Sequence, residues 1–474
     1  MSLALLTDYY QLSMGYGYWK SGLAERESVF HLFFRRRPFE GGFTIAAGLE
    51  AVVDYLDHFQ FTKEDLAYLK DYFPSDFLKY LRKMRFKCSV EAVPEGTAVF
   101  PYEPLLRIQG PLIQCQILES PLLNLINFPT LIATKAARLC IAAGNDEVME
   151  FGLRRAQGVD GALTASRASY IGGCHATSNV LAGMKYGIPV RGTHSHSWVM
   201  AFEDEQKAFQ TFAEELPKQT VFLVDTYDTV EGVKRAIEVG KWLKSQDQPF
   251  VGIRLDSGDL ADLSIKARHL LDQAGFSKTQ IIASNELDET LISELKRQGA
   301  KIDIWGVGTN LVTAKDQPAL DGVYKLSAIR DEEGEWRYTL KLSEQMLKIS
   351  NPGILQVRRF YRDETRLLDV IYDVAHSVHG DWHVIDPFDP TMQGVVTADT
   401  ASVDLLVPIY KQGKRVYELP SLISIRERTR SELAHFPVGI KRFLNPHRYF
   451  VGMEQHLYEI KVALIKKIRK QQHL

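Results

Sequence analysis

The sequence lacks the features that mark several large classes of protein. Its 57 basic and 59 acidic residues give a formal net charge of -2, so it has no basic excess of the kind that nucleic-acid-binding proteins carry. It has four cysteines and no C-x-x-C pair, which argues against a disulfide framework or a structural zinc site. With 45% hydrophobic and 24% charged residues, the composition is that of a folded globular protein.

Signals for secretion and membrane insertion are also missing. The first eight residues contain no basic side chain and reach an acid at Asp8, so we expect no secretory signal. The most apolar stretch, residues 122–133, is interrupted by Asn124, Asn127 and Pro129 and is too short to span a bilayer. We therefore expect a cytoplasmic protein that binds neither membranes nor nucleic acid.

A chain of 474 residues is too long for one small core, and we expect three regions. Residues 1–140 read as a mixed α+β domain with short antiparallel strands. Residues 141–345 read as a barrel-like α/β domain that would hold a catalytic site. Residues 346–474 read as strands and helices that pack on the other two regions, and the tail from Pro420 onward reads as helical.

Six short apolar runs alternate with amphipathic segments in the middle of the chain. The runs are 148–152, 188–193, 221–226, 250–256, 281–285 and 302–306, and the helical periods between them include 230–244, 260–274 and 288–299. This alternation is typical of parallel βα units. Six units favour a barrel-like α/β domain, and the absence of G-x-G-x-x-G after the first run weighs against a dinucleotide fold.

Outside that region the local patterns differ. Residues 48–85 indicate helices, residues 86–118 indicate short antiparallel strands, and residues 119–143 indicate one helix with a kink at Pro129. Residues 323–329 and 336–342 indicate the two strands of a hairpin.

The predicted strand ends carry many polar side chains. In parallel α/β barrels the C-terminal strand ends form the active site, so these side chains should gather at one mouth. They are Arg154, Arg155, Thr193, His194, His196, Asp225, Asp228, Arg254, Asp256, Asp259, Asn285, Glu286, Gly306, Gly308 and Thr309. The set suits a phosphorylated, metal-complexed anion, and a Schiff-base enzyme is disfavoured because no lysine falls among these ends.

Three of these segments allow more than one interpretation. Residues 306–311 could cradle a phosphate with backbone N–H groups or simply form a tight turn. In residues 254–259 the carboxylates could hold ribose hydroxyls or Mg²⁺, while Asp256 or Ser257 could cap a helix. His194 and His196 could be structural, could bind a metal, or could include a phosphate-accepting nucleophile.

Several short motifs together resemble the nicotinate phosphoribosyltransferase family. They are residues 6–11, 150–156, 192–193 with 196–198, 225–228, 254–259 and 306–309, and they follow that family's order. The resemblance implies an irregular, incomplete (β/α) barrel with a mixed α+β N-terminal domain and a helical C-terminal extension. It also implies a homodimer with shared active sites, in which nicotinate and phosphoribosyl pyrophosphate give nicotinate mononucleotide and pyrophosphate. Coupled ATP hydrolysis and Mg²⁺ are implied as well, although the Mg²⁺ ligands stay unassigned.

The resemblance also assigns roles to individual residues. His196 resembles the histidine that ATP phosphorylates, and Arg254 resembles the residue that engages nicotinate. Further residues carried over in this way are Thr193 for nicotinate, Tyr10 and Phe151 for the two faces of the pyridine ring, Asp256 for the ribose, Gly308 and Thr309 for the 5-phosphate, and Arg154 for pyrophosphate. For Tyr10 and Phe151 the alternative is core packing.

One position departs from the family pattern. His175 stands where relatives commonly have an aspartate, which in nicotinamide-specific relatives faces the amide, so the change favours nicotinate slightly. The roles of His175 and His194 stay open. The alternatives to the expected activity are nicotinamide phosphoribosyltransferase, the shorter quinolinate phosphoribosyltransferases and a non-catalytic barrel that binds phosphometabolites.

Overall fold

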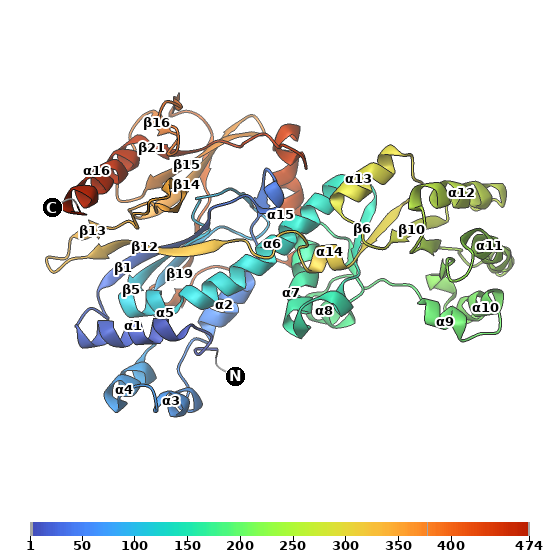
Figure 1. Cartoon of the computed structure of the whole chain (residues 1–474), viewed down its shortest axis with the longest axis horizontal. Coiled ribbons are helices and arrows are strands. Elements are labelled where there is room, and N and C mark those ends of the chain that lie inside the picture. The colour runs from blue at the N-terminus through green and yellow to red at the C-terminus, as the bar shows by residue number, and fades with distance from the viewer. Residues whose placement is uncertain (1–2, 377, 473–474) are drawn as a thin grey trace. The chain divides into compact units, whose positions relative to one another are not determined.

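The computed structural model describes residues 3–376 and 378–472 and divides into two compact units. Unit 1 combines Met1–Leu131 with Ala319–Leu474, and unit 2 is Ile132–Pro318. The elements of both units are labelled in Figure 1.

Unit 2 contains a six-stranded sheet in which every ladder is parallel. Its strands are β6 (Glu147–Glu150), β7 (Ala176–Thr177), β8 (Val221–Leu223), β9 (Gly252–Leu255), β10 (Gln280–Ser284) and β11 (Ile304–Val307). Its α-helices after α6 are α7 (Gly158–Ile171), α8 (Val180–Tyr186), α9 (His196–Met200), α10 (Glu205–Glu215), α11 (Thr229–Ser245), α12 (Leu260–Gln273), α13 (Glu289–Arg297) and α14 (Thr309–Val312). Because all strands run the same way, their C-terminal ends lie at one edge of the sheet.

The strand order is β7-β6-β11-β10-β9-β8, which forms a half-barrel. β11, the last of these strands in the sequence, pairs with β6, the first. Among the described strands no ladder joins β7 to β8, so the sheet does not close. The inner face carries a small core of Met149, Ala176, Val221, Ile282 and Ile304. The prediction of parallel βα units is therefore confirmed for unit 2.

One predicted strand is wrong. Residues 188–193 form only an isolated bridge between Val190 and Thr177. Pro189 has no N–H to donate to a ladder, which limits pairing on this segment. The two-residue strand β7 lies next to β6 instead, and it is too short to give a sequence signal.

Unit 1 contains two larger sheets. The first is antiparallel throughout, in the order β13-β12-β1-β5-β3-β19-β20. Its strands are β1 (Glu27–Phe34), β3 (Ser89–Ala92), β5 (Leu106–Pro111), β12 (Gly322–Arg330), β13 (Trp336–Tyr338), β19 (Val407–Lys411) and β20 (Lys414–Arg415). The predicted hairpin is confirmed as β12 and β13.

The second sheet is built from the C-terminal part of the chain, in the order β17-β16-β21-β15-β14-β18. Its strands are β14 (Leu355–Arg362), β15 (Thr365–Asp373), β16 (Trp382–Ile385), β17 (Gln393–Val396), β18 (Ser402–Asp404) and β21 (Val451–Glu454). Describing the C-terminal extension as helical is therefore wrong in part. Strands fill most of residues 355–415, and the helices α15 (Leu422–Ala434) and α16 (Gln455–Gln472) follow, with β21 between them.

The remaining elements of unit 1 are short helices and one short strand pair. They are α1 (Tyr9–Lys20), the pair β2 (Thr44–Ile45) and β4 (Ala98–Val99), α2 (Leu49–Asp57), α3 (Lys63–Leu69), α4 (Ser75–Lys83) and α5 (Leu112–Ile117). The helices predicted in 48–85 are confirmed. Residues 112–117 form a helix instead of the expected strand, because β5 ends at Pro111 and Leu112 to Ile117 are all buried.

α6 (Glu119–Ala143) has the bounds that the sequence predicts and continues through Pro129. Pro129 cannot donate a hydrogen bond to the Leu125 carbonyl, and that carbonyl meets Gly48 at the start of α2. A Cβ on Gly48 would lie 2.1 Å from the Leu125 oxygen, and its φ is +104°, so only glycine fits there.

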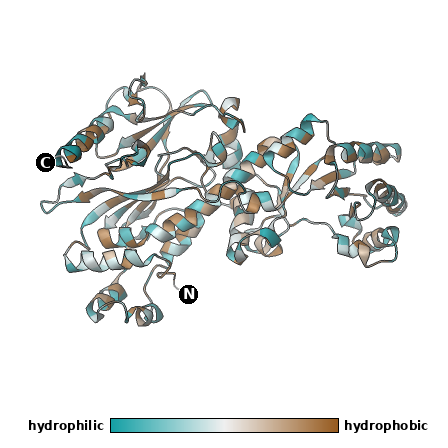
Figure 2. Cartoon of the chain, in the orientation of Figure 1, coloured by the Kyte–Doolittle hydropathy of each residue, from teal (hydrophilic) through white to brown (hydrophobic). Residues whose placement is uncertain are grey.

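By length and composition α6 could also cross a membrane. From the sequence we considered only residues 122–133 as a membrane span, and the helix is longer than that stretch. In the most apolar 18-residue window of α6, 67% of the residues are buried inside the protein, as expected for a core helix. Figure 2 shows hydrophobic residues gathered along this helix and along the strands.

Candidate active site

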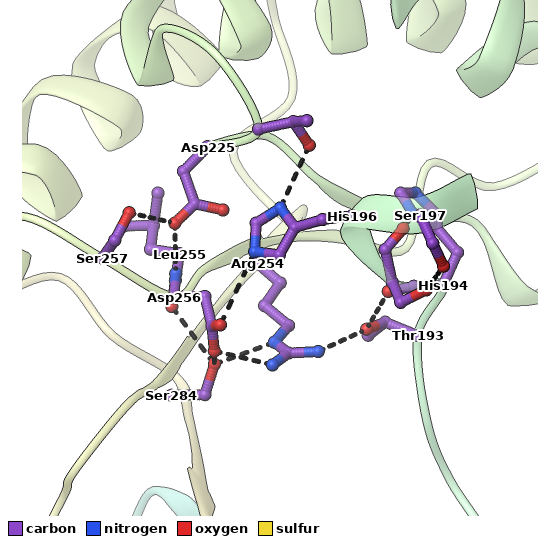
Figure 3. A network of polar contacts seen from close by, with 12 residues as sticks. Thr193, His194, His196, Ser197, Asp225, Arg254, Leu255, Asp256, Ser257 and Ser284 are labelled. Carbon is purple, nitrogen blue, oxygen red and sulfur yellow. Dashed lines mark hydrogen bonds and ion pairs between the residues drawn. The ribbon is translucent and has the colours of Figure 1, made fainter. Parts of the chain in front are cut away.

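Arg254, near the C-terminal end of β9, is fixed by three hydrogen bonds (Figure 3). Its Nη1 donates to Thr193 Oγ1 (3.0 Å), its Nε donates to Ser284 Oγ (2.8 Å) and its Nη2 donates to Asp256 Oδ1 (2.6 Å). These bonds use three of the five N–H groups of a guanidinium, so one N–H on each Nη can still donate to a ligand. The side chain is 14% exposed, which leaves the cation accessible but oriented.

Asp256 shares its neighbours with Arg254. Ser284 Oγ also donates to Asp256 Oδ1, so one hydroxyl joins the cation and the carboxylate. Burial is the largest influence on the pKa of Asp256 and raises it, but Arg254, Ser284 and His196 together lower it below its usual value. Asp256 is therefore ionised at neutral pH.

Asp225, which follows β8, holds the segment that follows β9. Its Oδ2 accepts from the Asp256 N–H (2.9 Å) and from Ser257 Oγ (2.6 Å). Its Oδ1 is buried and has no hydrogen-bond partner within the described part of the chain. This oxygen therefore lacks the donor or cation that a buried carboxylate oxygen requires.

His196, the first residue of α9, points into this network. Its Nδ1 shares a hydrogen bond with Thr226 Oγ1 (3.2 Å), and its Nε2 lies 3.7 Å from Asp256 Oδ2. Its side chain is 41% exposed, so a bulky substrate can reach the ring. Figure 3 shows the imidazole beside Asp256.

His194 is buried and makes structural contacts. Its Nε2 accepts the Leu223 N–H (3.2 Å), so it ties the loop before α9 to the edge of β8. Its ring packs against Phe209, Phe212 and Phe222, and burial lowers the pKa of His194 to about 4. Of the interpretations left open for the two histidines, a structural role therefore suits His194, and a shared metal site is disfavoured.

Phe151 lies directly after β6, beside the guanidinium of Arg254. The guanidinium carbon is 5.9 Å from the ring centroid of Phe151. A Cβ on Gly306 would lie 2.6 Å from the Phe151 ring, so this glycine allows the ring to approach β11 closely. Arg154 follows in a short 3₁₀ turn (Leu153–Arg155) and is exposed.

These side chains surround a hollow of about 230 Å³. It is lined by Phe151, Leu153, Arg154, Ser178, Gly192, Thr193, His194, Ser195 and Arg254. This is smaller than the roughly 300–1,000 Å³ of typical drug-sized sites, so it suits a small ring rather than a whole nucleotide. Ser178 lines it without having been singled out in the sequence.

His175 is not among those lining residues. Its Nδ1 accepts the Val148 N–H (3.2 Å), and it precedes β7, below the strand ends. The slight preference for nicotinate that the sequence drew from His175 therefore finds no support in its position.

Gly308 and Thr309 begin the short helix α14 after β11. Both are partly exposed at the same strand edge as Arg254. The buried Asn310 fixes this turn, because its Nδ2 donates to the carbonyls of Glu286 (2.9 Å) and Leu287 (3.0 Å). Asn285 and Glu286 have φ values of +93° and +42°, a strained conformation that is frequent at functional sites.

Two acids at the strand ends are helix caps. Asp228 accepts from the Glu231 N–H at the start of α11, and Asp259 accepts from the Ala261 and Asp262 N–H groups at the start of α12. The alternative in which Asp256 or Ser257 caps α12 is therefore wrong, because Asp259 holds that position.

Tyr10 belongs to unit 1 and is 48% exposed on α1. Its neighbours in the motif anchor the helix. Thr7 Oγ1 donates to the Ile117 carbonyl (3.1 Å), Ser120 Oγ donates to Asp8 Oδ2 (2.5 Å) and Gln11 Nε2 donates to Glu119 Oε2 (3.0 Å). The alternative of core packing does not describe Tyr10, since its ring is presented to the surface.

A larger hollow of about 720 Å³ lies in unit 1, with Arg35, Arg36, Arg37 and Arg448 among its lining residues. None of the residues singled out in the sequence lines it. The unit 2 hollow, by contrast, collects Phe151, Arg154, Thr193 and Arg254. We therefore take the unit 2 hollow as the candidate active site.

No group of three or more His, Cys, Asp or Glu side chains that could hold a metal occurs among the described residues. Mg²⁺ often needs only one or two protein carboxylates when phosphates of a substrate supply further oxygens. Asp225 Oδ1 and Asp256 Oδ2 are oxygens of this kind. The donor set therefore fits an ion that arrives with a phosphorylated substrate.

The sequence missed Ser178, Thr226 and Ser284 at this site. Single hydroxyl residues on strands and loops have no pattern that distinguishes them. The arrangement as a whole combines an oriented arginine, an aromatic ring and a small hollow, which can bind a flat, carboxylate-bearing ring.

The chain is similar to characterised proteins over almost its whole length. Residues 5–127, 147–336 and 355–461 match the family models of the nicotinate phosphoribosyltransferase N-terminal domain, family and C-terminal domain. The nicotinate phosphoribosyltransferase of Bacillus subtilis (strain 168) is 43% identical over 99% of this chain and 96% of that protein. That of Homo sapiens is 34% identical over 96% and 95%.

Solved structures agree with the sequence matches. The crystal structure of human nicotinic acid phosphoribosyltransferase matches with a TM-score of 0.85 and 31% identity, over 97% of this chain and 99% of that chain. A nicotinate-nucleotide pyrophosphorylase from Pyrococcus furiosus matches at 0.70 with 23% identity, over 92% and 96%, and shows a likeness of fold alone. The chain therefore belongs to the nicotinate phosphoribosyltransferase family.

Proposed function

We propose that this protein transfers the ribosyl phosphate of phosphoribosyl pyrophosphate to nicotinate, forming nicotinate mononucleotide and pyrophosphate in NAD salvage. Family membership supports the reaction. The observation that carries the choice of acceptor is the fixed guanidinium of Arg254 at a hollow sized for a small ring. A carboxylate gains more from such a cation than a neutral amide does.

In the proposed complex the nicotinate carboxylate accepts from the two unused Nη N–H groups of Arg254, next to Thr193. The pyridine ring lies against Phe151, and Tyr10 of a partner subunit covers its other face. The ring nitrogen is already nucleophilic, so no general base is needed. The barrier lies in the departure of pyrophosphate from the ribose carbon, which leaves positive charge on the sugar.

The remaining polar residues would hold the donor. Gly308 and Thr309 would bind the 5-phosphate with the N–H groups at the start of α14, and Asp256 would accept from ribose hydroxyls. Arg154 would bind the pyrophosphate. Mg²⁺, held by Asp225 and Asp256 oxygens together with phosphate, would stabilise the charge on the leaving group.

We assign ATP coupling to His196. The unprotonated Nε2 would attack the γ-phosphorus of ATP while the protonated Nδ1 donates to Thr226 Oγ1, and the P–O bond to ADP would break. Water would later cleave the P–N bond, which releases phosphate and restores the imidazole. Thr226 would orient the ring through Nδ1. This coupling would give the enzyme a ligase-type classification.

We further propose a homodimer with shared sites in the cytoplasm. The exposed Tyr10 supports the shared site, since 48% of the residue is exposed. Four free cysteines accord with a reducing compartment. The incomplete barrel that the resemblance implies accords with the open sheet of unit 2.

The test is an assay for nicotinate mononucleotide with nicotinate or nicotinamide as acceptor, each with and without ATP. We expect nicotinate turnover that ATP stimulates. Preference for nicotinamide would move the enzyme to the alternative activity, and donor binding without pyrophosphate release would make it a sensor. His196→Ala should abolish the ATP stimulation and keep slow turnover without ATP, whereas unchanged stimulation would remove His196 from the mechanism.

A further inference from the structure

Glu150, the last residue of β6, is a buried carboxylate with no part in the chemistry above. It is 1% exposed. Successive side chains of a strand point to opposite faces, so Met149 and Phe151 face the inside of the half-barrel and Glu150 faces the other side. A carboxylate in such a place is unfavourable unless donors meet both of its oxygens.

Three donors meet it, and all three are neutral. The Gly152 N–H donates to Oε1, while Ser166 Oγ of α7 (2.8 Å) and Thr177 Oγ1 of β7 (2.5 Å) donate to Oε2. One side chain thus joins three segments of unit 2.

The first of these segments forms one wall of the hollow. Gly152 sits between Phe151 and Arg154, and its other side packs against Val312, where a Cβ would lie 2.2 Å away. The turn is therefore held from two sides. Its position sets where the Phe151 ring and the Arg154 guanidinium point.

The segment that contains Thr177 and Ser178 forms the adjoining wall of the hollow. Ser178 lines the hollow, and its N–H donates to the Glu150 carbonyl (2.9 Å). Thr177 Oγ1 accepts the Asn179 N–H (3.0 Å), and Asn179 Nδ2 donates to Ser166 Oγ (3.2 Å). The hydroxyls that bind Glu150 therefore also fix the backbone on either side of Ser178.

We infer that Glu150 is a positioning residue for nicotinate: from behind the hollow it fixes the Phe151–Arg154 turn and the Ser178 segment in one relative position. This inference rests on the proposed function. Glu150 touches no substrate, and its effect reaches the ring through Phe151 and Ser178. A misplaced wall should weaken nicotinate binding, because productive geometry tolerates little displacement.

The experiment compares Glu150→Ala, Glu150→Gln and Thr177→Val with the unaltered protein. Glu150→Ala should raise the KM for nicotinate by about tenfold or more, with a smaller change in kcat. Glu150→Gln should stay within about threefold, because an amide can accept from Gly152 and donate to a hydroxyl. Thr177→Val keeps the side-chain shape, removes one donor to Glu150, and should raise the KM for nicotinate by a few fold.

Glu205→Ala is the matched control. Glu205 is also 1% exposed in unit 2, pairs with Arg235 (2.9 Å), and does not line the hollow. It should lower the thermal midpoint and leave the KM for nicotinate unchanged. Glu150→Ala with only this stability loss would overturn the inference.

If Glu150→Ala does not fold, Thr177→Val decides, and a wild-type KM for nicotinate in that variant overturns the inference as well. A failure of the proposed function and a failure of the Glu150 inference give different results. No nicotinate mononucleotide from the unaltered protein refutes the proposed function, whereas normal turnover with unaffected variants refutes only the role of Glu150.

Discussion

Ser284 connects the two charged side chains on which the candidate site depends. Its hydroxyl accepts from Arg254 Nε and donates to Asp256 Oδ1, and the residue is 4% exposed. Without it, Arg254 keeps its charge and its bonds to Thr193 and Asp256 but loses one of three constraints.

Ser284→Ala should therefore lower kcat/KM for nicotinate by roughly tenfold, the equivalent of about 1.4 kcal/mol for one net hydrogen bond near charged groups. Steady-state kinetics at several nicotinate concentrations measure this. The thermal midpoint should change little, because the substitution removes only the hydroxyl group. An unaltered kcat/KM would mean that Thr193 and Asp256 orient the guanidinium by themselves.

His194 makes the stability of unit 2 depend on pH. Its pKa is lowered to about 4 in the folded protein, chiefly by burial, and the unfolded value is about 6.5. The unfolded chain therefore binds a proton that the folded chain does not over this range. The resulting stabilisation is fully present above pH 6.5 and is lost as the pH falls toward 4, by up to about 3 kcal/mol.

His194→Gln should flatten this part of the pH profile, since an amide can accept the Leu223 N–H without titrating. Denaturant unfolding of both proteins between pH 4 and pH 8 measures the difference. His31 in unit 1 is buried and also has a lowered pKa, so both proteins retain a residual slope. Parallel profiles for the two proteins would contradict the assignment to His194.

At the scale of elements, residues 254–259 combine a binding segment with a helix start. Asp256 faces Arg254 and His196, while Asp259 caps α12 through the Ala261 and Asp262 N–H groups. Asp259→Ala should cost about 1 kcal/mol of unfolding free energy, the usual loss for an N-cap, and leave the KM for nicotinate unchanged. Asp256→Asn should raise the KM for nicotinate and leave the unfolding free energy nearly unchanged.

Chemical denaturation and kinetics on the same two variants test this division. A loss of turnover in Asp259→Ala without loss of stability would place Asp259 in the binding segment. The contrast matters because both residues are acids at one strand end and are indistinguishable by type.

Much of this element pattern was predictable, and the exceptions have physical causes. Long apolar periods gave β8 to β11 and α11 to α13 close to their observed bounds, because burial on one face dictates the spacing. Ala176–Thr177 is too short to show a period, and the apolar residues around Pro189 resemble a strand although Pro189 cannot donate to a ladder. His194 and His196 differ in role because α9 begins between them, which residue type alone does not reveal.

At the scale of the whole molecule, the two compact units differ from the three regions expected from the sequence, because residues 319–345 belong to unit 1. The chain leaves unit 1 after Leu131 and returns at Ala319, so unit 1 forms from segments far apart in sequence. Apolar periodicity reports local structure and carries no information on such long-range pairing, as between β1 and β12.

Sharing of the active site between subunits is a property of the whole assembly, and Tyr10 and Arg254 allow it to be tested. If Tyr10 completes the site of its partner, Tyr10→Ala and Arg254→Ala each inactivate both sites of their own homodimer. A mixed dimer then contains one site with both changes and one site with neither. Equimolar mixing with subunit exchange should restore about a quarter of wild-type activity, since about half of the dimers are mixed and each has one intact site. Activity that stays at the sum of the two variants, with exchange verified by native mass spectrometry, would show that Tyr10 serves the site of its own chain.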